Sequence, residues 1–297
     1  MKKTSFAAIL VSLVMFIVIS PSKLIAAGPA NPSNGHAKVV IPPHAVEVAP
    51  GVFSLGTAMD KGRVVEGYAI IKTRKKKFAK PDSCNNDGVC DPGEKKNCPD
   101  CRSGGGEETD TSSCYEYTRG VKWKIFEDYI VNPANTRGLS STFVTDNLNF
   151  DINKWELAAG NIDILGDGFD TSETLVADLD QPDDSNEVYF ADVDYPGAIA
   201  VTIVWGIFRG PPSWRELVEW DQVYDDFDFD WSDSGETGKM DFENIATHEL
   251  GHSVGLNDLY DTPCIDQTMY GYAGNGETNK RTLEDGDENG IWELYNR

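Results

Sequence analysis

The stretch His248-Glu249-Leu250-Gly251-His252-Ser253-Val254-Gly255-Leu256-Asn257-Asp258 decides the fold expected for this chain. On an α-helix, residues four apart lie on one face, so His248 and His252 can offer two imidazoles to a single metal ion. Glu249 follows the first histidine and can reach a water molecule at that metal. The stretch therefore predicts a helix that carries a zinc site.

The pair of histidines needs a third protein ligand, because zinc used for hydrolysis keeps three ligands and one open position. The chain has only four histidines, and the other two, His36 and His44, lie far away in the N-terminal region. Gly255 has no side chain and can bend the backbone back toward the metal. Asp258, six residues after His252, is the expected third ligand.

The pattern HExxHxxGxxD resembles the extended zinc signature of the metzincin metallopeptidases, whose third ligand is usually His and in a minority Asp. The segment Thr268-Met269-Tyr270-Gly271-Tyr272 is similar to the methionine turn that this family carries beneath the metal. A third segment is similar to the last helix of matrixin catalytic domains at Leu283, Asp287, Gly290, Ile291, Leu294 and Tyr295. The alternatives are an amphipathic helix with surface histidines and an inactive relative that keeps the zinc.

The resemblance implies an α+β, zincin-like catalytic domain with a twisted mixed sheet, an antiparallel edge strand, a backing helix, an active-site helix and a C-terminal helix. It implies a secreted, monomeric zinc endopeptidase in which zinc-activated water attacks the peptide bond and Glu249 is the general base. A protein or peptide substrate would bind in extended form along the edge strand. Two other functions stay open, a non-catalytic secreted metal-binding protein and a zinc amidase acting on cell-wall peptide.

Charge is unevenly distributed along the chain, which has a formal net charge of -23. The first 110 residues hold 15 Lys and Arg against 11 Asp and Glu, whereas the remainder holds 11 against 38. Such an acidic surface repels phosphate backbones, which argues against nucleic acid as a partner. Calcium is a better candidate, and solubility or salt tolerance is the alternative explanation.

Residues 1–27 are predicted to be a signal peptide, because Met1-Lys2-Lys3 precedes an apolar run over residues 6–19. That run is short for a membrane span, although an uncleaved anchor is the alternative. The protein body is therefore expected outside the cytoplasm, where its six cysteines would form disulfides.

Residues 28–81 form an N-terminal region that is a candidate propeptide. Its first part, residues 28–50, is expected to be a flexible leader, and Val52–Leu55 and Tyr68–Ile71 are expected strands. The basic run Arg74–Lys77 is either a processing site or a solvated loop. Matrixin propeptides usually hold a cysteine in a Pro-Arg-Cys-Gly pattern that caps the zinc; this chain lacks the pattern, which argues against that switch.

Residues 82–102 are predicted to be a small cysteine-rich module. Two internal disulfides are favoured over zinc for its four cysteines, Cys84, Cys90, Cys98 and Cys101. Oxygen-bearing residues with the spacing of an EF-hand loop make calcium a candidate ligand; they are Asn85, Asp87, Asp91 and Glu94. The alternative is a disulfide knot with acidic turns.

Residues 103–113 are predicted to be a linker, and residues 114–297 the metallopeptidase domain. Cys114 and Cys264 remain, and a bridge between them would tie the start of the domain to the loop after the zinc helix. The expected elements are a first strand at 121–125, a backing helix at 141–159, strands at 187–190 and 198–205, and a strand followed by an acidic turn at 219–231. The strand at 198–205 is expected at the sheet edge, although a buried central strand would look alike. The acid-rich stretch 161–184 is either a calcium site or a solvated loop, and it has no histidine for a second, structural zinc.

Overall fold

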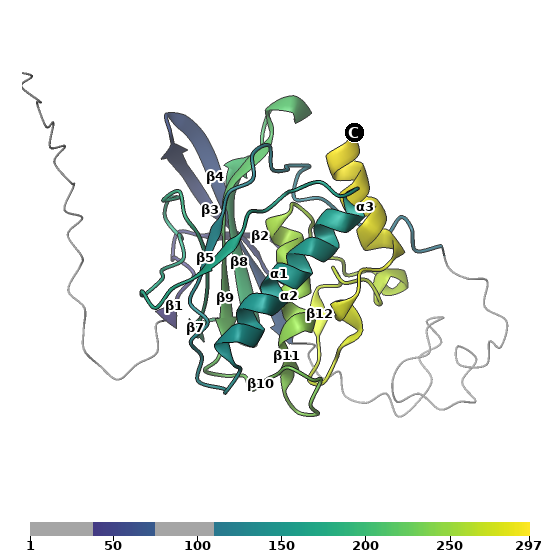
Figure 1. Cartoon of the computed structure of the whole chain (residues 1–297). Helices are drawn as coiled ribbons and strands as arrows, with labels where there is room; N and C mark the ends of the chain where they lie inside the picture. The colour runs from purple at the N-terminus through teal and green to yellow at the C-terminus, as the bar shows by residue number, and fades with distance from the viewer. Residues whose placement is uncertain (1–37, 75–109) are drawn as a thin grey trace, which may run out of the picture. The chain divides into compact units, whose positions relative to one another are not determined.

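The computed structural model describes residues 38–74 and 110–297 (Figure 1). The predicted signal peptide, the cysteine-rich module and the candidate calcium ligands within it lie outside these residues. None of the described helices is both long and apolar enough to cross a membrane.

One twisted mixed sheet organises the described chain. Its strands follow the order β2 (Val46–Ala49), β3 (Val52–Asp60), β4 (Arg63–Arg74), β8 (Ala198–Ile207), β9 (Glu216–Asp225), β7 (Asn186–Val193), β5 (Tyr129–Val131) and β6 (Gly168–Asp170). From β9 to β6 the strands are parallel, whereas β8 is antiparallel to both of its neighbours. Short parallel strands extend it: β1 (Lys38–Val39) pairs with β7, and β12 (Tyr272–Ala273) pairs with β4.

Three α-helices in the described residues complete an α+β fold, as predicted: α1 (Ser141–Ala158), α2 (Phe242–Ser253) and α3 (Asp285–Asn296). Short elements lie between them: β10 (Trp231–Ser232) pairs with β11 (Met240–Asp241), and single 3-10 turns occur at Pro212–Trp214, Thr262–Cys264 and Asn279–Arg281. Figure 1 shows α1 beside α2 in front of the sheet. The Trp155 indole N–H of α1 donates to the Thr247 carbonyl of α2 at 2.8 Å, which fixes the two helices together.

The core lies on both faces of the sheet, because alternate residues of a strand point to opposite sides. On the helix-covered face, Trp220 and Tyr224 of β9 pack in one cluster with Trp155 and with Phe242 of α2. On the other face, Val201 and Ile203 of β8 and Ala69 and Ile71 of β4 pack under Leu175 and Ala177. The sheet thus supports α2 from behind and has a second apolar layer of its own.

The predicted backing helix and the strands in 51–71, 187–190 and 219–231 are confirmed by α1, β3, β4, β7 and β9. The expected strand at 121–125 is wrong. Val121 and Trp123 are buried as the alternation implied, but the Trp123 amide donates to the Tyr295 hydroxyl instead of a neighbouring strand. The expectation of a flexible leader also fails where it is described, because β1 and β2 lie within residues 38–50.

The strand predicted at 198–205 exists as β8 but does not lie at an edge. It pairs with β9 on one side and with β4, from the N-terminal region, on the other. The edge expected for an extended substrate is therefore covered by the chain itself.

The bridge between Cys114 and Cys264 is present, with Cα atoms 5.5 Å apart and a sequence separation of 150 residues. It ties the start of the predicted peptidase domain to the turn that precedes the methionine segment, as expected.

Candidate metal centre on helix α2

Helix α2 carries the predicted HExxH residues and is almost entirely buried. Asp241 caps its N-terminus, because the Asp241 side chain accepts the Asn244 amide at 3.0 Å and so satisfies a free N–H of the first turn. Gly251 faces the methionine turn, and a Cβ at this position would lie 2.2 Å from Met269 Sδ. The absence of a side chain at Gly251 therefore lets Met269 lie directly against the helix.

The turn after α2 depends on Gly255, as the sequence suggested. Its φ is +106°, a backbone conformation that side chains rarely allow, and a Cβ would lie 2.6 Å from the Val121 carbonyl oxygen. The Thr118 amide donates to the Gly255 carbonyl at 3.0 Å and anchors the turn. The chain then runs back along the helix and brings Asp258 to the two histidines.

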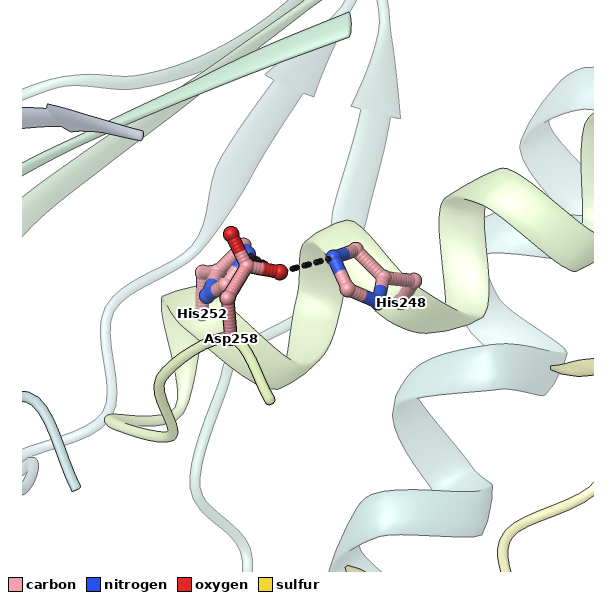
Figure 2. Close-up of side chains that lie close together, drawn as sticks. All are labelled: His248, His252 and Asp258. Atoms are coloured by element: carbon pink, nitrogen blue, oxygen red, sulfur yellow. Dashed lines mark ion pairs between the residues drawn. The ribbon is translucent and has the colours of Figure 1, made fainter. Parts of the chain in front are cut away.

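His248, His252 and Asp258 converge inside the protein (Figure 2). Asp258 Oδ1 lies 3.1 Å from His248 Nε2 and 3.6 Å from His252 Nε2. One ligand atom from each residue lies within 4.8 Å of the other two. The three predicted ligands are therefore brought together by a helix and the loop that follows it.

Backbone carbonyls orient both imidazoles. His248 Nδ1 is 2.6 Å from the Thr268 carbonyl oxygen, and His252 Nδ1 is 3.1 Å from that of Leu256. Each Nδ1 therefore donates to a carbonyl, which leaves each Nε2 as the acceptor atom that faces Asp258. Burial lowers the pKa of both histidines, that of His248 to about 3, so the neutral form that binds metals is favoured.

Two atoms of this cluster indicate that the residues fit a metal ion. His252 Nε2 and Asp258 Oδ1 are buried and have no hydrogen-bond partner. A buried polar atom without a hydrogen-bond partner is energetically costly. Where one occurs, an ion or a water molecule usually binds it. Two imidazole nitrogens and one carboxylate oxygen are a common donor set for zinc.

Glu249 lies next to this cluster and is held from the sheet. Thr202 Oγ1 of β8 donates to Glu249 Oε2 at 2.6 Å, whereas Glu249 Oε1 is buried without a hydrogen-bond partner. Burial raises the pKa of Glu249 to about 8, and the Thr202 hydrogen bond acts in the opposite direction. One oxygen is thus fixed and the other can accept a proton.

Several supporting residues were missed from the sequence. Thr202 and Tyr260 are two of them, and the Tyr260 hydroxyl lies 3.1 Å from Asp258 Oδ2. From the sequence, Asp287 stands out only as part of the segment similar to the last matrixin helix. In the structure its carboxylate accepts the amides of Thr268 and Met269 at 2.7 and 3.1 Å. A carboxylate of α3 therefore fixes the methionine turn, a contact that no local pattern could predict.

Lys72 of β4 is a further residue at the cluster that the sequence did not single out. Its Nζ lies 3.0 Å from Nδ1 and 3.1 Å from Nε2 of His248, and it donates to the Tyr270 carbonyl at 2.6 Å. The side chain is completely buried, and burial lowers the pKa of Lys72 to about 7. The only sequence signal is a lysine that follows the apolar run Tyr68–Ile71.

A second cluster of carboxylates lies on the face of the sheet opposite to α2. Asp178 comes from the predicted acid-rich stretch, and Glu219 and Asp221 come from β9. Asp178 Oδ2 and Glu219 Oε1 are buried without hydrogen-bond partners. Burial raises the pKa of all three residues, that of Asp178 to about 6. These oxygen ligands suit a hard divalent cation such as calcium.

Comparison with known proteins identifies a family whose profile covers the segments that form this site. The sequence profile described as Matrixin matches residues 146–296, which include most of α1, the HExxH helix, the methionine turn and α3. Matrilysin of Homo sapiens is 38% identical to this chain over 72 residues. That alignment covers 24% of this chain and 26% of the human protein, so it spans about a quarter of the relative.

Proposed function

Since the chain belongs to the matrixin family, we propose that it is a secreted zinc endopeptidase with His248, His252 and Asp258 as zinc ligands and Glu249 as the general base. The observation that carries the proposal is the cluster itself. Three buried ligand atoms face one another, two of them lack hydrogen-bond partners, and a carboxylate with one free oxygen lies beside them. A purely structural metal site would not need that carboxylate.

The proposed chemistry divides roles among these groups. When bound, zinc would polarise the scissile carbonyl and activate a water molecule. Glu249 takes the proton of the attacking water and passes it to the leaving amine. Thr202 holds the second oxygen of Glu249 in place, and the Nδ1 hydrogen bonds keep both imidazoles in the tautomer that ligates through Nε2. Tyr260 orients the Asp258 carboxylate by a hydrogen bond to Oδ2.

Secretion and calcium are parts of the same proposal. The charged and apolar N-terminus supports export, and the Cys114–Cys264 disulfide fits an oxidising environment. Asp178, Glu219 and Asp221 would hold calcium as a stabilising ion. The candidate calcium loop at residues 82–102 remains a second, independent prediction.

The decisive experiment compares wild type, Glu249→Gln and Asp258→Asn. Zinc content is measured by mass spectrometry of the metal, and cleavage is measured with a library of extended peptides before and after limited trypsin treatment. We expect Glu249→Gln to keep the zinc and to cleave about 10²–10⁴-fold more slowly, because it cannot act as a base. Asp258→Asn should lose zinc affinity.

Two outcomes would decide for the alternatives. Equal cleavage by wild type and Glu249→Gln, or none by either after trypsin treatment, would rule out the peptidase and favour a metal-binding protein. Cleavage restricted to cell-wall peptides in a parallel assay would favour the amidase.

A further inference from the structure

β4 lies along the border of β8 where an extended peptide substrate would bind. It runs antiparallel to β8, with Ile70 opposite Thr202 and Lys72 opposite Ala200. On its other side it runs parallel to β12, with Thr73 opposite Tyr272. β4 thus fills the strip between β8 and the segment that follows the methionine turn.

The side chains of β4 alternate between the two faces of the sheet. Ala69 and Ile71 belong to the core on the side away from the helices, whereas Tyr68 and Ile70 belong to the core that includes α2. Lys72 continues the second series, because residues two apart point to the same side. This alternation explains why Lys72 points toward α2 and reaches His248.

The register places β4 directly beside the candidate catalytic groups. Ile70 is opposite Thr202, the residue whose hydroxyl holds Glu249. Two residues further on, Lys72 contacts His248 and donates to the carbonyl of Tyr270. The backbone beside the proposed base and zinc ligands, where a substrate backbone is expected, is therefore β4 of the same chain.

We propose that β4 is a built-in occupant of the substrate position, and that the chain is latent while β4 stays paired with β8 and Lys72 stays beside His248. This inference rests on the proposed peptidase function. Latency has two parts. Strand pairing uses the backbone N–H and C=O groups of β8 that a peptide substrate would need. Lys72 Nζ lies 3.1 Å from His248 Nε2, the atom proposed to bind zinc, and therefore competes with the metal for that atom.

β4 would not leave readily, since it is also paired with β3 and contributes to both cores. Cleavage on its C-terminal side would free it to separate, and the sequence is basic there from Arg74 to Lys77. The competing explanation is that β4 is a permanent strand and that Lys72 only fills space.

The first test measures zinc affinity of the full-length protein by competition with a chromophoric chelator. The variants are Lys72→Ala and Lys72→Met, which keeps the length of the side chain. Lys61→Ala is the control, because Lys61 lies in the β3–β4 turn of the same hairpin and pairs with Asp184 on the surface. We expect both Lys72 variants to bind zinc at least about ten-fold more tightly than wild type and the control to be unchanged. Circular dichroism identifies any variant that fails to fold. If Lys72→Ala fails to fold, the zinc affinity of Lys72→Met decides the test.

The second test follows peptide cleavage by wild type before and after limited trypsin treatment, with intact mass reporting the cut. We expect cleavage to rise at least about ten-fold when the chain is cut after β4, and a synthetic peptide of residues 63–74 to reverse the gain. The same peptide with alanine at position 72 should inhibit less.

The two proposals fail in different ways. If wild type and the Lys72 variants bind zinc equally, or if the uncut chain cleaves peptides as fast as the cut one, latency by β4 is wrong although the peptidase stands. The second possibility is that the Lys72 variants bind zinc tightly but no form of the protein cleaves peptides, cut or uncut. The peptidase proposal then fails, whereas competition between Lys72 and the metal remains supported.

Discussion

Removing the Cys114–Cys264 bridge should cost a large part of the stability of the protein. The bridge joins residues 150 positions apart, so without it the unfolded chain gains the freedom of a very long loop. The chain-entropy relation gives about 5 kcal/mol for a loop of that length. The perturbation is the double variant Cys114→Ser and Cys264→Ser, which leaves the other four cysteines in place.

The loss of the bridge should also weaken the proposed zinc site. Cys264 lies three residues before Gln267, whose Oε1 accepts the amides of Gly286 and Asp287 at the start of α3. Asp287 in turn holds the amides of Thr268 and Met269. A looser turn at Cys264 should therefore weaken zinc binding as well as the fold.

The assay is equilibrium unfolding in guanidinium chloride, with thiol titration to verify that no other cysteine has become free. We expect the free energy of unfolding to fall by about 2–5 kcal/mol, because native-state adjustments usually reduce the full entropic value. Oxidised wild type, measured under the same conditions, is the matched comparison. A double variant as stable as the oxidised wild type would refute the reasoning.

Three further predictions concern the site and the sheet. Thr202→Val should slow peptide cleavage by about ten-fold to a hundred-fold with unchanged zinc content, because Glu249 loses a charge-assisted hydrogen bond. Thr202→Ser should retain most of the rate, and equal rates in wild type and both variants would contradict this prediction. Gly255→Ala should lower the free energy of unfolding by at least about 1–3 kcal/mol in urea titrations, because its φ is +106° and the Cβ meets a carbonyl; an unchanged midpoint would show that the turn adapts. Burial raises the pKa of Glu219, to about 10, and of Asp221, so the native state holds protons that the unfolded chain releases. Stability without calcium should therefore fall as pH rises from about 4 through neutral, and millimolar calcium should remove most of that fall in thermal unfolding midpoints; a midpoint that rises over this range would exclude the buried acidic cluster as the cause.

The parts of the site that follow from the sequence are those set by local geometry. His248 and His252 face the same way because they are one helical turn apart, and Gly255 and Asp258 follow within a single loop. Each of these relations spans a few residues, so spacing alone was enough to predict that His248, His252 and Asp258 lie together.

The supporting contacts could not be predicted because they join distant segments. Thr202 reaches Glu249 from β8, and Lys72 reaches His248 across 176 residues of sequence. Neither residue has a local pattern that distinguishes it from other polar residues in strands. Their roles depend on which strands are neighbours, which the sequence of a single chain does not state.

Two of the three errors in the fold have the same origin. Val121 and Trp123 alternate with lysines as a strand would, but the Trp123 amide bonds to a side chain of α3. β8 is apolar enough to be either an edge or a central strand, and its actual place was decided by β4. Burial can be predicted from alternation, whereas the backbone partner cannot.

The contact between Gly251 and Met269 ties two positions that belong to different elements. Alanine at position 251 would push a methyl group into the sulfur, so the side chain at 269 would have to shift or become smaller. Among related sequences the two positions should therefore vary jointly. A directed-evolution library that randomises only one of them would miss the functional combinations, and one that randomises both should recover pairs of matched volume.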